Sequence, residues 1–429
     1  MLFVLALGVI LLVIQPFPVL HDYPEWMYQG HIVYSLLSGE NPSLNMLYEW
    51  VPVPVPNTIS QLVIGLLNFT VSPVMAGQIW LAVYLLLAIV SGYLASKDHV
   101  HAGSVFWLFT VTIAFGPGFW NGYINFQFGL LLFALFVAVG LRRSLAWVFV
   151  LSVLIYFSHA SVFAGFVCFV VLAELFNQRR LTTLLALGPA LVLLLWYTMT
   201  RFAEGTGKNV ALESVSQWIQ YKFYTLAKLG PFHNFIRPDG ESLLAPLHGL
   251  YMAGFVVNFV IAMLVGVWLL FIAWQMVRRT DSRLHYGLLF TAIVLMLAWL
   301  LAGKNSFGVV NLGERFLIVA MMLLIMQIQC PDWIRKSWVA LTAVVGVVTL
   351  VTLVVLSGYS DKNYTVARSA ATTELESYVD DIYQNSRHKY FNHRLTIYAS
   401  LGQYLATPEA FDKPPLIDHE SSIVRIRKP

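Results

Sequence analysis

The sequence predicts an all-α polytopic membrane protein with about 11 transmembrane helices, and two observations support this fold class. First, 58% of the 429 residues are hydrophobic and 11% are charged, whereas soluble domains are about 25% charged. Second, apolar runs recur that, at about 1.5 Å per residue, can cross a hydrocarbon core of ~30 Å. A transmembrane β-barrel would instead show alternating segments of about ten residues.

Each expected helix corresponds to one apolar run. The first run lacks a basic leading region and a small-residue cleavage site, so we expect a retained helix rather than a cleaved signal peptide. Twelve hydrophobic segments occur, at 2–20, 58–74, 76–95, 103–119, 122–140, 144–158, 160–176, 183–200, 249–276, 284–302, 315–330 and 337–357.

Basic pairs between the segments predict the topology. Two segments separate each pair from the next, so all four can share the cytoplasmic side, as the positive-inside rule requires. The net charge of +4 reflects this loop asymmetry, and we predict no nucleic-acid partner. The pairs are Arg142–Arg143, Arg179–Arg180, Arg278–Arg279 and Arg335–Lys336.

Segment 58–74 is short and carries polar residues such as Gln61 and Asn68. Its apolar residues follow helical spacing, which is typical of a helix lying in the membrane interface. Without it, eleven spans remain, the N-terminus is cytoplasmic and the C-terminus is extracytoplasmic. Residues 21–75 then form a long first outer loop with interfacial helices.

The remaining organisation follows from this topology. Residues 1–357 form the expected transmembrane domain, in which 201–248 is a second large outer loop. Residues 358–429 form a small extracytoplasmic tail or cap, where Leu375, Tyr378 and Ile382 share one helical face. The cysteines, Cys168 and Cys330, form no disulfide framework or zinc pattern.

Polar side chains gather in the outer turns. These turns read WNGYINFQ at 120–127, SHAS at 158–161 and GKNSFGVVNLGER at 303–315. If they converge with the first loop, they form a pocket at the outer membrane–water boundary, acidic at one end and basic at the other. Such a pocket suits sugar transfer from a polyprenyl phosphate, because a carboxylate can deprotonate the acceptor hydroxyl while cations hold the leaving phosphate.

Two residues are the main candidates for this chemistry. Asp22 is the expected base, because it starts the outer loop immediately after the first helix. Arg315 is the expected phosphate clamp, because a guanidinium binds phosphate oxygens in a bidentate fashion.

In order and sidedness, these motifs resemble the GT-C superfamily of membrane glycosyltransferases, including bacterial members in which a D-Y-P motif opens the first loop. The resemblance covers about residues 1–330 and rests on LHDYPEW, VPVPNTISQLVIGLL, GYINFQFGLLLFAL, YFSHASVF and GERFLIVAMMLL. It implies a GT-C-like fold, Asp22 as catalytic base and a polyprenyl-phosphate sugar as donor. The acceptor would be a lipid, glycan or protein, and the location the bacterial inner membrane.

The sequence departs from the paired acidic motif of many family members, because Tyr23 follows Asp22 and the next acid is Glu25. Whether Glu25 assists, and whether a divalent metal takes part, therefore stays open. The sequence requires no other cofactor. Further candidates are His21 and His159 as auxiliary groups, and Lys304, Arg201, Asn125 and Tyr123 as binding groups for the donor phosphate.

Structural roles compete with each functional one. Asp22 and Glu25 fit a helix capping box, with Pro24 in the first turn. His159 is equally consistent with turn formation. Asn125 suits the start of a helix, Lys304 an ordinary loop, and Arg315 a pair with Glu314 or extension to the surface.

Rival functions also stay open. A transporter or lipid flippase would favour charged residues at mid-membrane and internal repeats, and we find neither. A non-catalytic component of a cell-surface polysaccharide assembly system would tolerate loss of Asp22. A glycan polymerase or ligase of another fold would use the loop 201–248. There, Val215, Trp218, Ile219, Lys222 and Phe223 share one side of an expected helix that lies on the membrane or forms an acceptor lid.

Overall fold

The computed structural model of the chain describes most of residues 20–229 and parts of the remainder. The described residues are 10, 20, 22–99, 102–139, 144–177, 181–203, 214–229, separate positions within 259–274, 283–303, 305–306, 309–327, 404–405 and 422–427. The expected spans 2–20 and 337–357, most of 249–276, and the tail helix near Leu375 lie outside them.

Helices dominate the described residues, which confirms the all-α prediction. The helices are α2 (Tyr23–Ser38), α3 (Pro42–Leu47), α4 (Ile59–Leu67), α5 (Pro73–Ser96), α6 (Ala102–Phe109), the π-helical turn η1 (Thr110–Ala114), α7 (Pro117–Trp120), α8 (Ile124–Val139), α9 (Leu145–Ser158), α10 (Ala160–Asn177), α11 (Leu181–Ala203), α12 (Val215–Lys228), α14 (Arg283–Leu301) and α15 (Leu312–Ile325). Two short antiparallel pairs join β1 (Tyr48–Trp50) to β4 (Val424–Ile426) and β2 (Asn305–Ser306) to β3 (Val309–Val310).

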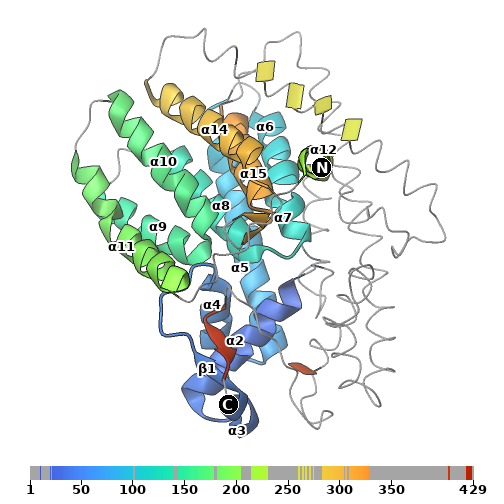
Figure 1. Cartoon of the computed structure of the whole chain (residues 1–429), viewed down its shortest axis with the longest axis vertical. Helices are drawn as coiled ribbons and strands as arrows, with labels where there is room; N and C mark the ends of the chain where they lie inside the picture. Colours follow the sequence, from blue (N-terminus) through green and yellow to red (C-terminus); the bar gives the residue numbers. More distant parts are fainter. Residues whose placement is uncertain are drawn as a thin grey trace, which may run out of the picture.

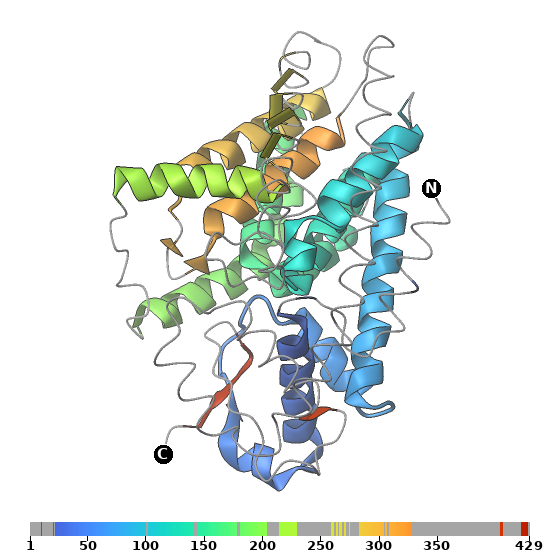
Figure 2. The same ribbon diagram turned by 90° about the vertical axis from the view of Figure 1, so that its right-hand side faces the viewer.

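The longer helices form a bundle, and the first-loop elements α2, α3, α4 and β1 gather at one end of it (Figure 1). Within the bundle, α8 packs against α5, α9 and α10, while α14 packs against α10 and α15. Figure 2 shows the yellow-green helix α12 running across the direction of the long blue helix α5.

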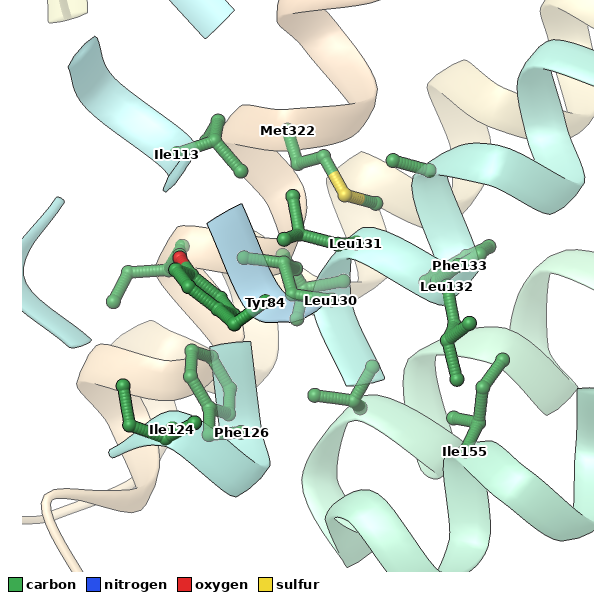
Figure 3. Close-up of a cluster of buried hydrophobic side chains, with 14 of the residues drawn as sticks. Tyr84, Ile113, Ile124, Phe126, Leu130, Leu131, Leu132, Phe133, Ile155 and Met322 are labelled. Carbon is green, nitrogen blue, oxygen red and sulfur yellow. The ribbon is translucent and has the colours of Figure 1, made fainter. Parts of the chain in front are cut away.

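The core centres on α8, whose side chains are buried around almost its whole circumference. A helix that is apolar on all sides is expected in such a position. In Figure 3, Phe126 and Leu130 of α8 lie near Tyr84 of α5, and Leu131 lies near Met322 of α15. The apolar run at 122–140 thus forms α8, the central helix of the bundle.

Two described helices, Pro73–Ser96 and Thr182–Thr200, are long and apolar enough to cross a membrane. Other apolar helices are shorter, such as Ile124–Val139 and Leu145–Ser158. Several helices point large apolar side chains outward, including Leu86 of α5 and Leu185 of α11, which is 75% exposed.

The segment expected as one span at 103–119 departs from a single helix. Regular helix gives way to the π-helical turn η1, and the chain then turns at Gly116 into the short helix α7. The hydroxyls of Thr110 and Thr112 donate to the carbonyls of Phe106 and Leu108. π-Helical turns of this kind are common where a helix must redirect the chain.

Helix α4 matches the expectation that segment 58–74 does not span. Its 9 residues reach only about 13 Å, well short of a hydrocarbon core. It packs closely on α2, where a Cβ at Gly65 would lie 2.6 Å from the Val33 side chain. Leu66 on its other side is exposed.

The C-terminal strand β4 returns to the first loop. Trp50 lies opposite Val424 and Tyr48 opposite Ile426. The Arg425 side chain pairs with Glu49 at 2.8 Å. Residues 48–50 and 424–426 therefore lie at the same end of the bundle.

Candidate functional site

The turn that follows α7 holds the start of α2. The backbone N–H of Asp22 donates to the Asn121 carbonyl at 3.1 Å, and Trp26 Nε1 donates to the Gly122 carbonyl at 2.9 Å. Gly122 has a φ of +73°, and a Cβ there would lie 2.4 Å from the Asp22 nitrogen. Glycine permits both this conformation and the close approach.

Asp22 precedes α2 without capping it. Its side chain makes no capping hydrogen bond. In a capping box, the Glu25 carboxylate would accept a hydrogen bond from the Asp22 backbone N–H, but that N–H donates to the Asn121 carbonyl. The capping-box interpretation of Asp22 and Glu25 is therefore wrong. Asp22 is 8% exposed.

Glu25 belongs to a buried polar network instead. Its Oε1 accepts a hydrogen bond from Gln29 Nε2 at 3.0 Å. Gln29 Oε1 in turn accepts from the Ser422 hydroxyl at 2.8 Å. This network ties the second turn of α2 to the C-terminal strand, which favours the structural role for Glu25.

Arg315 lies near the start of α15 and reaches the same turn that holds Asp22. Its guanidinium carbon is 5.1 Å from the centroid of the Tyr123 ring, a cation–π distance. Its Nη1 lies 2.9 Å from His159 Nε2. Its Nε is buried and has no hydrogen-bond partner among the described residues. The expected convergence of the outer turns is thus present around Tyr123.

His159 occupies the tight turn between α9 and α10 and is 6% exposed. Its Nδ1 lies 2.8 Å from Ser161 Oγ and 3.1 Å from the Ser161 nitrogen. Phe126 packs edge-to-face on the ring at 5.3 Å. Burial and the neighbouring Arg315 guanidinium hold the pKa of His159 well below its usual range, so the ring is neutral.

Asn125 joins α8 to the first loop. Its Oδ1 accepts from the Ser60 N–H and its Nδ2 donates to the Asn57 carbonyl, each at 2.8 Å. Both ends of this buried amide are engaged by backbone, which favours the structural role for Asn125 over donor binding. The Asn57 carbonyl and the Ser60 N–H are thereby satisfied at the start of α4.

The structure leaves three candidates without a described side chain. His21 and Lys304 lie outside the described residues, and Arg201 is described only as part of the α11 backbone. Within the described ranges, no group of three or more His, Cys, Asp or Glu side chains is placed to hold a metal ion.

Lys222 of α12 was not expected to be buried. Its Nζ donates to the carbonyls of Trp299 and Ala302 at the end of α14. The rings of Trp218, Tyr221 and Trp299 face it at 5.1–5.6 Å. The residues expected to share one face of this helix therefore differ in burial. Lys222 is buried, whereas Val215, Ile219 and Phe223 are exposed.

Helix α12 also contacts the helix that carries Arg315. The Tyr221 hydroxyl accepts from the Glu314 N–H at 3.4 Å. Helix α12 is therefore anchored one residue from Arg315. Sequence periodicity did not predict the burial of Lys222, because a lysine in a helix usually extends its ammonium to solvent.

The residue 121–123 turn thus binds the backbone of Asp22, whose side chain is a carboxylate, and stacks on the Arg315 guanidinium, which contacts the neutral His159 imidazole. A carboxylate can accept a proton, and a guanidinium with an unpartnered Nε can bind an oxyanion. Searches of protein-family models, of curated proteins and of solved structures each found no match to this chain.

Proposed function

We propose that the chain is an integral membrane glycosyltransferase of the GT-C type, which transfers a sugar from a polyprenyl phosphate to an acceptor hydroxyl. The observation that carries the proposal is that one short turn, residues 121–123, contacts both Asp22 and Arg315. A proton acceptor and a phosphate binder close to each other are what this reaction requires.

In the proposed reaction, the acceptor hydroxyl attacks the anomeric carbon and its proton passes to the Asp22 carboxylate. The bond from the anomeric carbon to the phosphate oxygen breaks on the opposite face, so the configuration inverts. The polyprenyl phosphate leaves with the negative charge, and Arg315 neutralises it through charge-assisted hydrogen bonds. Asp22 then loses its proton to water.

Membrane insertion is part of the proposal. The outward side chains of α5, α11 and α14 are mainly apolar, and Leu301 is 83% exposed. Helices with apolar outward faces are stable in lipid, because the hydrocarbon tails solvate apolar side chains better than water does. We assign the site to the extracytoplasmic face of a bacterial inner membrane, with a lipid, glycan or protein as acceptor.

The test is transfer from radiolabelled polyprenyl-phosphate sugars by the purified protein in liposomes. Asp22→Asn should lower the rate by about 10²–10⁴-fold, the usual contribution of a general base. Asp98→Asn, at an exposed acid beyond the far end of α5, is the matched control. If Asp22→Asn transfers sugar at the normal rate, Asp22 is not the base. If the wild-type protein transfers no sugar from any of these donors, the chain is a non-catalytic assembly component or a transporter.

A further inference from the structure

The contact between His159 and Arg315 restricts the state of the histidine. A guanidinium has only N–H donors and stays charged, so it can bond Nε2 only if that nitrogen carries a lone pair. The 2.9 Å distance between Nη1 and Nε2 therefore requires a neutral ring. This contact favours the tautomer in which the ring proton sits on Nδ1.

Ser161 completes this arrangement and also offers a competing one. Its Oγ lies 2.8 Å from Nδ1 and can accept the ring proton. Its backbone N–H is also directed at Nδ1, at 3.1 Å, and donates to that nitrogen only when Nδ1 carries a lone pair. The serine hydroxyl is thus the group that permits the tautomer Arg315 needs.

Arg315 is held from two directions. Tyr123 supports the plane of the guanidinium at 5.1 Å, and His159 accepts from one of its terminal nitrogens. Since Nη1 is engaged, the edge formed by Nε and Nη2 remains, and Nε is buried without a partner among the described residues. That edge has the two parallel N–H groups which match two oxygens of one phosphate.

We propose that His159 is a positioning residue, which acts as a neutral acceptor in the tautomer permitted by Ser161 and aims the Nε–Nη2 edge of Arg315 at the phosphate of the lipid donor. This inference rests on the proposed function, because it takes Arg315 to be the phosphate clamp. His159 itself contacts no substrate and transfers no proton in this scheme.

The test measures binding of farnesyl phosphate, which carries a lipid phosphate but no sugar, to the full-length protein by calorimetry. His159→Leu removes the acceptor and should weaken binding about tenfold, as expected for one charge-assisted hydrogen bond. His159→Gln, whose amide oxygen can accept, should stay within about threefold of wild type.

Ser161 gives the sharper comparison. Ser161→Ala leaves only the backbone N–H at Nδ1, which favours the tautomer that points an N–H at Arg315, so binding should weaken. Ser161→Thr keeps the hydroxyl and should bind normally. A purely structural histidine would not distinguish these two variants, and equal binding by both would overturn the inference.

Two further measurements separate the possible failures. Nitrogen-15 spectra of labelled histidine should place the His159 proton on Nδ1 in the wild-type protein, and a proton on Nε2 would overturn the inference even if the variants fold poorly. Arg315→Gln should lose farnesyl phosphate binding. If that variant binds normally, the clamp of the proposed function fails. If it loses binding while His159→Leu does not, only the role of His159 fails.

Discussion

The guanidinium of Arg315 lies 5.1 Å from the ring centroid of Tyr123, in the same turn whose Asn121 carbonyl binds the backbone of Asp22. Residues from the first outer loop, the turn before α8 and the start of α15 therefore share one local structure. Changes at this turn should affect both ends of the site together.

Gly122→Ala should damage both stability and activity. The φ of +73° is unfavourable for alanine, and the added Cβ would collide with the nitrogens of Asp22 and Tyr23. We expect a loss of about 1–3 kcal/mol in the free energy of unfolding. We also expect slower sugar transfer. Thermal unfolding in detergent measures the loss of stability, and the radiolabelled-donor assay measures the transfer rate. Gly103→Ala is the control, because its Cβ would meet open space in α6.

Lys222→Met should destabilise the attachment of α12. The substitution keeps most of the aliphatic side chain but leaves the Trp299 and Ala302 carbonyls without their charged donor. Loss of such hydrogen bonds costs about 1.5–3 kcal/mol, which should appear as a lower melting temperature. Lys97→Met, at the exposed end of α5, should melt normally. Equal melting of the two variants would mean that α12 is held by its apolar contacts alone.

His31 should make the protein sensitive to mild acid. Burial lowers the pKa of His31 to about 4, whereas the unfolded chain titrates near its usual value of about 6.5. Between these values the unfolded state binds more protons, so stability is full above about pH 6.5 and falls as the pH drops toward 4. His31→Phe keeps the ring contacts with Tyr34 and Tyr404 and should flatten this dependence. The melting temperature at pH 7 and pH 5 measures it.

Much of the helical layout could be predicted because apolar runs bounded by polar residues define helix limits. The expected segments 122–140 and 144–158 became Ile124–Val139 and Leu145–Ser158. The break after Phe109 could not be predicted, because a π-helical turn depends on local packing rather than on hydropathy. The burial of Lys222 could not be predicted for a similar reason, because the spacing of apolar residues in α12 does not reveal that the end of α14 covers this lysine.

The residue types of the candidate site could be chosen from the sequence, but the contacts between them could not. Asp22 and Arg315 stood out because ionised groups are rare in this apolar chain. The bond between His159 and Arg315 depends on how α10 and α15 pack, which no local pattern encodes. Gly122 gave no signal either, because its positive φ is invisible in a sequence.

Cysteine labelling should place three distant segments on one side of the membrane. Exposed positions Ser43, Ser72 and Arg427 are expected on the outside, and Ser144 on the inside. In a background with Cys168 and Cys330 replaced by alanine, a membrane-impermeant maleimide should label the first three cysteines in intact cells. Ser144→Cys should react only after permeabilisation. Its labelling in intact cells would contradict the topology.

A charge exchange should test the pairing of β1 with β4. Glu49→Arg or Arg425→Glu alone places like charges opposite each other, whereas the double substitution restores attraction. We expect a coupling of about 0.2–1 kcal/mol, small because both side chains are partly exposed. Melting temperatures of the four proteins give the value, and a coupling of zero would mean that the Glu49–Arg425 ion pair does not stabilise the strand pair.

The β1–β4 pair also imposes an order on biosynthesis. Glu49 and Arg425 are separated by 376 positions, so the ribosome completes nearly the whole chain before the partner of the first loop exists. Until then β1 has an unpaired edge and Gln29 lacks the Ser422 hydroxyl. A segment that is translated early is therefore among the last to mature, and a nascent chain that stalls before Arg425 would lack this strand pair.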